Sequence, residues 1–203
     1  MWALVEDGSI TKYFSGNKGV TIGDIQYSKN IFSFRWTNAE REAIGLYEVE
    51  FDNTNKKDEQ WYINTNQSFA FAGGKVTASY GSATAKPHAD VLFTAQDESD
   101  GRGTEGELDA RGLKYNLIRS VKKQAANILA ETDWYVVRKA DAGTAIPSAI
   151  TNHRAAVRTK AAEQETAITN AADTPALETL HTYTTQEDGS VTRPLGELPT
   201  LEV

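Results

Sequence analysis

The chain contains no cysteine. Disulfides, thiolate nucleophiles and cysteine-ligated zinc are therefore excluded, and a reducing compartment is the simpler expectation. Long apolar runs are also missing, because no window approaches the roughly 20 apolar residues that a membrane-spanning helix needs, and the N-terminus lacks the basic start and apolar core of a signal peptide. We therefore expect a soluble protein without a membrane partner, located in the cytoplasm where it is made.

Basic side chains are the minority among the charged residues. The chain has 21 Lys and Arg against 28 Asp and Glu, a net charge of −7. Phosphates are repelled by such a charge at long range, so we predict no nucleic-acid partner. The segment from Asp109 to Glu165 nevertheless has ten basic and six acidic residues. A basic helical part is typical of a solvated helix face, or of a surface that meets an acidic partner, and both interpretations stay open.

Motifs that carry chemistry are scarce. The three histidines are scattered along the sequence, and no serine lies in a Gly-x-Ser-x-Gly turn. Residues 96–107 have carboxylates at several positions of a calcium-binding loop, but Gln96 occupies the first position and the preceding residues indicate a strand instead of a helix. We predict no catalytic residue, no metal site and no cofactor, and hence a protein that is not an enzyme.

Residues 1–96 are predicted to form an antiparallel β-rich domain. Turn signals at Asp7-Gly8 and Gly73-Gly74 predict two hairpins. Alternating apolar residues predict further half-buried strands over residues 31–36 and 46–51. In the latter strand the inward side chains are expected to be aromatic or aliphatic: Tyr47, Val49 and Phe51.

A short helix is predicted between these two strands. Thr37 and Glu40 have the spacing of a capping box, in which the threonine hydroxyl accepts from the amide of Glu40 and the carboxylate accepts from the amide of Thr37. The helix should run over about residues 38–44 and end at Gly45.

The second half of the chain is predicted to be helical, which makes the fold class α+β. Residues 97–108 form an acidic, glycine-rich linker, and residues 109–182 an antiparallel helical hairpin. Its first helix is expected over residues 109–132, with apolar residues three or four apart on one side: Leu113, Leu117, Val121, Ala125 and Ile128. Residues 183–203 are expected to be an extended tail, with a weak hairpin as the alternative.

The joint between the two helices supplies the candidate partner-binding residues. Trp134 follows the first helix, where it could seal the elbow or anchor a partner, because tryptophan is enriched in binding hot spots. Trp36 is a further candidate anchor. Arg154 and Arg158 lie four residues apart and could reach Glu131 or Asp133 at the elbow, or grip an acidic partner. The sequence does not choose between these roles.

Residues 117–180 resemble the bacteriophage tail assembly chaperone and tail-fibre assembly families. The similar pattern comprises Arg119, the elbow Ile128–Trp134, Pro147 and the stretch His153–Arg158. His153 stands where these families usually have tyrosine. The front part of the chain, including the Trp36–Arg41 stretch, looks like the domain that precedes this module in similar phage proteins.

The resemblance implies a small phage protein that helps a tail fibre to fold or trimerise, without catalysis. Its expected partner is a tail fibre or another tail protein, with self-association left open. Its expected location is the host cytoplasm during assembly and, in some phages, the virion. A permanent structural role in the tail, baseplate or fibre, as an adaptor or connector, is the alternative.

Overall fold

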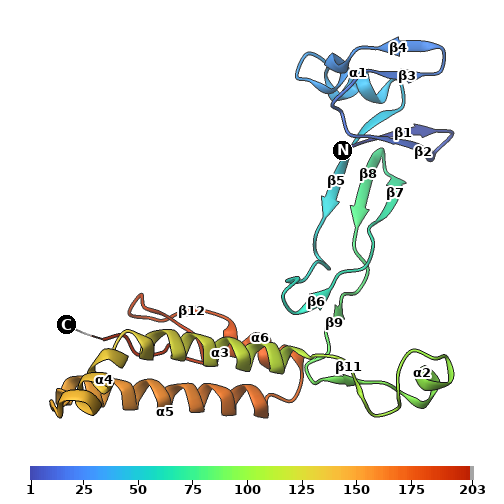
Figure 1. The fold of residues 1–203 in the computed structure, drawn as a ribbon. Helices are drawn as coiled ribbons and strands as arrows, with labels where there is room; N and C mark the ends of the chain where they lie inside the picture. The colour runs from blue at the N-terminus through green and yellow to red at the C-terminus, as the bar shows by residue number, and fades with distance from the viewer. Residues whose placement is uncertain (202–203) are drawn as a thin grey trace. The chain divides into compact units, whose positions relative to one another are not determined.

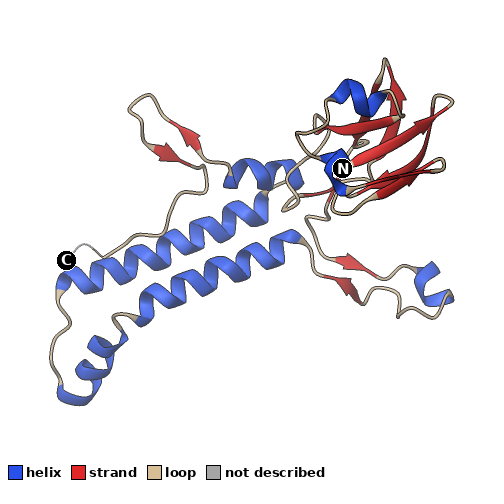
Figure 2. Cartoon of the chain, turned by 90° about the horizontal axis from the view of Figure 1, so that it is seen from above, coloured by secondary structure: helices blue, strands red, loops and turns tan. Residues whose placement is uncertain are grey.

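The computed structural model describes residues 1–201, and the chain divides into two compact units, one ending at Thr84 and the next beginning at Ala85. Strands dominate the first unit and helices the second (Figures 1 and 2), which confirms the α+β prediction. The boundary lies earlier than the predicted residue 96. The reason is that residues 85–96 belong to an arm whose base is bonded to the first long helix, as described below.

The first unit is built on one sheet with the strand order β2-β1-β5-β8-β7. Strands β1 (Trp2–Glu6) and β2 (Ser9–Phe14) form the first predicted hairpin, with positive φ at Asp7 and Gly8. Strands β7 (Ser68–Ala72) and β8 (Lys75–Ser79) form the second hairpin, in which both turn glycines also have positive φ. Paired positive φ angles are the signature of the primed turns that match strand twist, so both hairpin predictions are confirmed.

The central pair of this sheet corrects the prediction of a purely antiparallel domain. Strand β5 (Leu46–Asp52) is antiparallel to β1 but parallel to β8, where Val49 lies opposite Val76. Turn residues specify the direction of strands only within a hairpin. The connection from β5 to the second hairpin is long and holds only the two-residue strand β6 (Tyr62–Ile63), so no local signal fixed this direction.

The sheet is curled, because its two outermost strands approach each other. The rings of Tyr13 on β2 and Phe69 on β7 have centroids 4.9 Å apart. The enclosed core consists of small and β-branched residues: Ala3, Val5, Val49, Val76 and Ala78. Phe51, predicted to face inward, is 51% exposed. The tightly curled interior is filled by these smaller side chains, and β5 extends beyond it.

A second apolar cluster lies around Trp2, Ile31 and Leu46. It is covered in part by the ribbon of β3 (Val20–Ile22) and β4 (Ile25–Tyr27). Ala3 and Val5 belong to the first cluster and Trp2 to the second, so side chains on both faces of β1 are buried.

The strand predicted over residues 31–36 is wrong. The chain forms a 3-10 helix, η1 (Lys29–Phe32), followed by turns. Ser28 accepts a hydrogen bond from the Asn30 amide, and Ser33 donates to the Asn30 carbonyl at 2.7 Å. Such local bonds from serine compete with strand pairing.

Helix α1 (Asn38–Glu42) follows, with both predicted capping-box bonds formed. The Glu40 amide donates to the Thr37 hydroxyl at 3.3 Å, and the Thr37 amide donates to the Glu40 carboxylate at 2.7 Å. The Thr37 amide first, and then the Thr37 hydroxyl, which donates to the same carboxylate at 2.8 Å, hold the pKa of Glu40 below its ordinary value. The helix ends two residues earlier than predicted, and Gly45 follows it with a φ of 77°.

The second unit contains the predicted antiparallel pair of helices, α3 (Leu113–Ala130) and α5 (Ser148–Asn170). Lys114, near the start of α3, donates to the carbonyl of Thr169 near the end of α5. Helix α3 starts four residues later than predicted because residues 108–110 form a strand, β11. Helix α4 (Asp133–Ala142) lies in the connection, which the sequence had left without structure.

The predicted linker over residues 97–108 is instead part of a folded arm. Strands β10 (Val91–Leu92) and β11 (Leu108–Ala110) form its ribbon, and α2 (Ala95–Ser99) lies near its tip. A second capping box starts α2, where Thr94 and Asp97 exchange hydrogen bonds, and Asp97 also pairs with Arg102. Hydrophobic periodicity does not detect local polar bonds in a highly charged segment, so the sequence pattern did not predict this arm.

Over residues 183–201 the predicted extended tail is wrong, and the hairpin alternative describes the segment better, while residues 202–203 of that prediction lie outside the described residues. Strands β12 (Thr184–Thr185) and β13 (Val191–Thr192) pair after helix α6 (Thr174–His181). Leu195 is only 4% exposed, and its amide donates to the Leu180 carbonyl at 3.0 Å. One buried leucine and its backbone bond therefore hold the segment against the helices. Among residues 1–201, no helix is both long enough and apolar enough to span a membrane.

The attachment of this C-terminal segment is expected to depend on pH. Burial lowers the pKa of His181 below its ordinary 6.5, a bond to the Leu177 carbonyl opposes the shift, and the charge of Arg193 lowers the pKa further. His181 therefore binds a proton more readily in the unfolded state than in the folded state. The contribution of neutral His181 to folding stability is fully present above about pH 6.5, and it is lost as the pH decreases through the lowered pKa. An NMR titration of His181 and of the Leu195 amide measures this, and a His181 pKa at or above 6.5 would contradict it.

Candidate functional site

The elbow of the helical hairpin is organised around a buried arginine. Arg154, in the second turn of α5, is 8% exposed. Its guanidinium donates to the Leu129 carbonyl and to the Thr132 hydroxyl, both at 2.7 Å, and to the Asp133 carboxylate at 2.8 Å. The last carbonyls of a helix have no partner within that helix. Arg154 therefore bonds a carbonyl in the last turn of α3, which also accepts from Thr132, and the carboxylate of the first residue of α4.

The two arginines of the predicted pair have different environments in the structure. Arg154 reaches Asp133, as one of the predicted pairings required, while Glu131 accepts no bond from it. Arg158 is exposed and makes a long hydrogen bond, 3.4 Å, to the backbone carbonyl of Arg154. Arg154 therefore has a structural role at the elbow. Arg158 keeps its guanidinium at the surface, where the prediction that it contacts a partner stays untested.

Helix α4 presents an exposed aromatic and cationic surface. None of its ten residues is buried. The rings of Trp134 and Tyr135 have centroids 3.7 Å apart, and the Arg138 guanidinium lies 4.7 Å from the Trp134 ring and 5.3 Å from the Tyr135 ring. Val137 is 65% exposed beside them. We call Trp134, Tyr135, Val137 and Arg138 the α4 surface.

Trp134 does not seal the elbow. Its side chain is 51% exposed, whereas Thr132 is 2% exposed and, with Arg154, fills the joint. A hydroxyl and a guanidinium close the joint because they bond the end of α3, which an indole with one donor cannot do as fully. The anchoring role of Trp134 stays a prediction. The sequence signal for the rest of the α4 surface was the unbroken apolar run from Trp134 to Val137, which fits no amphipathic period.

Trp36, the remaining candidate, belongs to the core of the first unit. Its ring meets Tyr27 edge to face at 5.8 Å and packs against the cluster around Trp2. It is nevertheless only partly buried. Phe34, two residues earlier in the segment predicted as a half-buried strand, is 96% exposed. Of these two aromatic residues, Phe34 offers the larger free surface.

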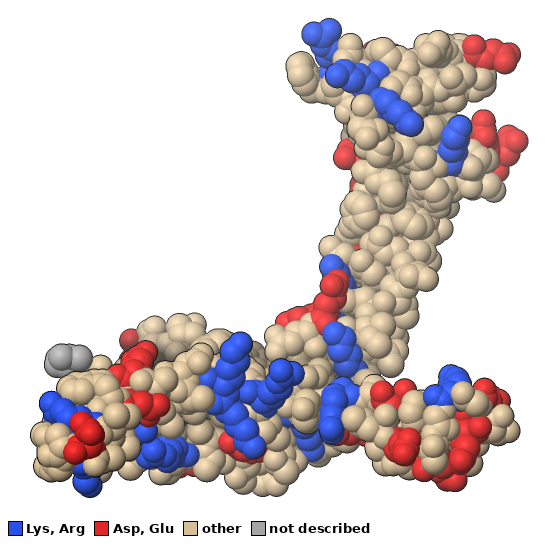
Figure 3. Space-filling view, in the orientation of Figure 1, with Lys and Arg blue, Asp and Glu red and all other residues tan. Residues whose placement is uncertain are grey.

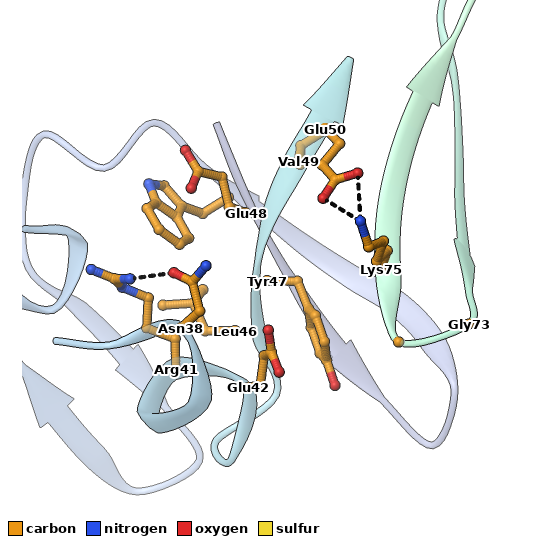
Figure 4. Close-up of a pocket in the computed structure, with 12 residues that line it drawn as sticks. Asn38, Arg41, Glu42, Leu46, Tyr47, Glu48, Val49, Glu50, Gly73 and Lys75 are labelled. Carbon is orange, nitrogen blue, oxygen red and sulfur yellow. Dashed lines mark hydrogen bonds and ion pairs between the residues drawn. The ribbon is translucent and has the colours of Figure 1, made fainter. Parts of the chain in front are cut away.

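A groove of about 630 Å³ in the first unit lies between α1, β5 and the turn that joins β7 to β8 (Figure 4). Arg41, the arginine that lines the groove, already bonds within the chain. It is buried, donates to the Ile31 carbonyl at 2.7 Å and lies 4.7 Å from the Trp2 ring. Lys75 pairs with Glu50 at 3.0 Å. The groove thus offers mainly carboxylates, and it brings together none of the predicted site residues.

The described residues contain no group of three or more His, Asp or Glu side chains that could hold a metal ion. Comparison with family models, with curated proteins and with solved structures finds no match for this chain.

Proposed function

We propose that this protein is a non-catalytic assembly factor, similar in role to phage tail-fibre assembly chaperones, and that its α4 surface binds a tail fibre or another tail protein. The observation that carries the proposal is a whole helix without a buried residue, on which tryptophan, tyrosine, valine and arginine lie together. The similarity of the elbow to those families supports the choice of partner.

The composition of the α4 surface suits protein recognition. Tryptophan, tyrosine and arginine are the residues most enriched in binding hot spots, where each can contribute about 2 kcal/mol or more. The Arg138 guanidinium already lies over two rings, so little side-chain freedom remains to be lost on binding. Arg154 holds the start of α4 in place, and the surface is therefore formed before a partner arrives.

An unassembled fibre chain is a suitable client for such a surface. Before a fibre trimer closes, its strands expose apolar side chains and unpaired edges, both of which promote aggregation. A short helix bearing aromatic side chains can cover apolar surface and be displaced later, because its contact area is small. This supports a transient role over a permanent one in the tail.

The test is coexpression of the cognate fibre with this protein and with its Trp134→Ala variant. We expect soluble trimer with the wild type, little with the variant, and binding weakened at least about 30-fold because a hot-spot tryptophan is removed. Tyr183→Ala is the control, since Tyr183 is 53% exposed but lies outside α4. A fibre that trimerises equally well alone would refute the proposal. A fixed copy number in purified particles would favour the permanent structural role.

A further inference from the structure

The arm of the second unit exposes an apolar pair on one face of its ribbon. Leu92 and Leu108 lie directly opposite each other on β10 and β11, and they are 50% and 40% exposed. The other face is covered in part, because the Phe93 ring packs so tightly on Gly103 that a Cβ there would lie 2.3 Å from it. A two-stranded ribbon is only marginally stable in water unless something covers it. The leucine pair is the part of the arm left without cover.

Carboxylates surround this leucine pair. Residues 96–107 contain five acidic residues and one arginine, a net charge of −4. Asp97 is buried and pairs with that arginine, Arg102. The other carboxylates stay exposed near the tip of the arm (Figure 3): Glu98, Asp100, Glu105 and Glu107. The arm therefore combines an apolar spot with a surplus of negative charge.

The exposed face of α3 has the opposite character. Helix α3 contains four basic residues and no acidic one. Arg119 and Lys123 are exposed there, whereas Lys122 pairs with Glu165 of α5. Figure 3 shows basic side chains gathered over this part of the helices. Tyr115, 42% exposed, lies one turn before Arg119. The Arg111 guanidinium lies 4.2 Å from the Tyr115 ring, so an apolar ring adjoins the cationic stripe.

The arm is held at its base, and its tip is free for an outside contact. The Gly112 amide, at the start of α3, donates to Asp90 at 2.9 Å, and Arg111 bonds the other carboxylate oxygen. These two bonds, the amide first, hold the pKa of Asp90 below its ordinary value, so the anchor persists at neutral pH. An anchored ribbon keeps its direction and presents the tip as a preformed surface.

We propose that the arm of one copy of this chain lies on the exposed face of α3 of a second copy. The leucine pair then contacts the Tyr115 region, and the arm carboxylates face Arg119 and Lys123. The opposite charges of the two surfaces select this occupant. Because each copy has both surfaces, two copies can exchange arms about a two-fold axis, or successive copies can form a larger ring or an open chain. This self-association is independent of the α4 surface.

A reciprocal charge exchange tests the contact. One variant carries Glu105→Lys and Glu107→Lys, the other Arg119→Glu and Lys123→Glu, and all four side chains are exposed. Sedimentation velocity in low salt should show self-association of the wild type, weakened at least about tenfold in each variant alone, because attraction becomes repulsion. Mixing the two variants should restore association, since each then meets a surface of opposite charge. Lys18→Glu with Lys29→Glu is the control for net charge.

Three outcomes would overturn the contact. A wild type that is monomeric at all accessible concentrations is the first, and it includes the case in which the arm contacts its own chain. The second is a mixture of the two variants that stays monomeric although circular dichroism shows both to be folded. The third is an equal effect of the Lys18 and Lys29 control. Trp134→Ala should leave self-association unchanged, which separates this test from that of fibre binding.

Discussion

Replacing Gly45 with alanine is expected to destabilise the first unit by about 3 kcal/mol, a large part of the stability of a small domain. Two effects add at this position. Gly45 has a φ of 77°, which costs an L-residue about 1–2 kcal/mol. A Cβ there would also lie 2.5 Å from the backbone carbonyl oxygen of Val5. That oxygen cannot move freely, because the backbone around it joins β1 to β5, where the Val5 amide donates to the Gly45 carbonyl.

Gly8 provides the matched control for this prediction. Its φ is 75°, nearly the same as that of Gly45, but no atom lies within 4 Å of the position its Cβ would take. Gly8→Ala should therefore show only the conformational cost, about 1 kcal/mol. Urea unfolding of both variants, followed by the fluorescence of the first unit, gives the comparison. Equal losses at the two positions would show that the contact with Val5 is relieved without cost.

Gly45 also illustrates what the sequence could predict. The structure confirms the capping box and gives Gly45 a positive φ, although the helix itself ends at Glu42 and not at Gly45. The hairpin at Gly73 and Gly74 was predicted in the same way. Each of these signals is carried by residues within a few positions of one another. Their physical causes, a side chain that caps an amide or a backbone that tolerates positive φ, act locally and can be recognised without knowing the rest of the fold.

Features set by distant residues could not be predicted in this way. The parallel pairing of β5 with β8 and the curl that brings Tyr13 to Phe69 depend on residues far apart in the chain. The alternating pattern of residues 31–36 was misleading, because serine side chains bond the local backbone and leave Phe34 in solvent. Hydrophobic periodicity reports burial on one side of an element, and it fails where local polar bonds decide the conformation.

In the candidate site, too, local features could be predicted from the sequence and contacts between distant residues could not. A contact between Arg154 and Asp133 was one of several pairings that the sequence left open, whereas the burial of Arg154 and its bonds to Leu129 and Thr132 could not be predicted. Helix α4 was missed because it has no apolar stripe facing a core. The lack of a stripe is itself the functional signal, since none of the residues of α4 is buried.

Replacing Arg154 with methionine is expected to destabilise the second unit by about 3 kcal/mol, because hydrogen bonds to a charged donor contribute about 1.5–3 kcal/mol. The Leu129 carbonyl and the Thr132 hydroxyl lose the donor they share. The ion pair adds less than about 1 kcal/mol, since the Asp133 side chain is 58% exposed.

The same substitution should also disturb the α4 surface, since Asp133 starts that helix and is released. Arg158→Met is the matched control: the change is identical and lies one turn further along α5, but the side chain is exposed, so a loss of stability below about 0.5 kcal/mol is expected.

Urea unfolding followed by circular dichroism measures stability, and hydrogen exchange of the α4 amides reports whether the start of α4 is released. If Arg154→Met and Arg158→Met unfold at the same urea concentration, the buried guanidinium is not what holds the elbow. If Arg154→Met loses stability while exchange in α4 is unchanged, the arginine stabilises the hairpin without positioning the binding surface.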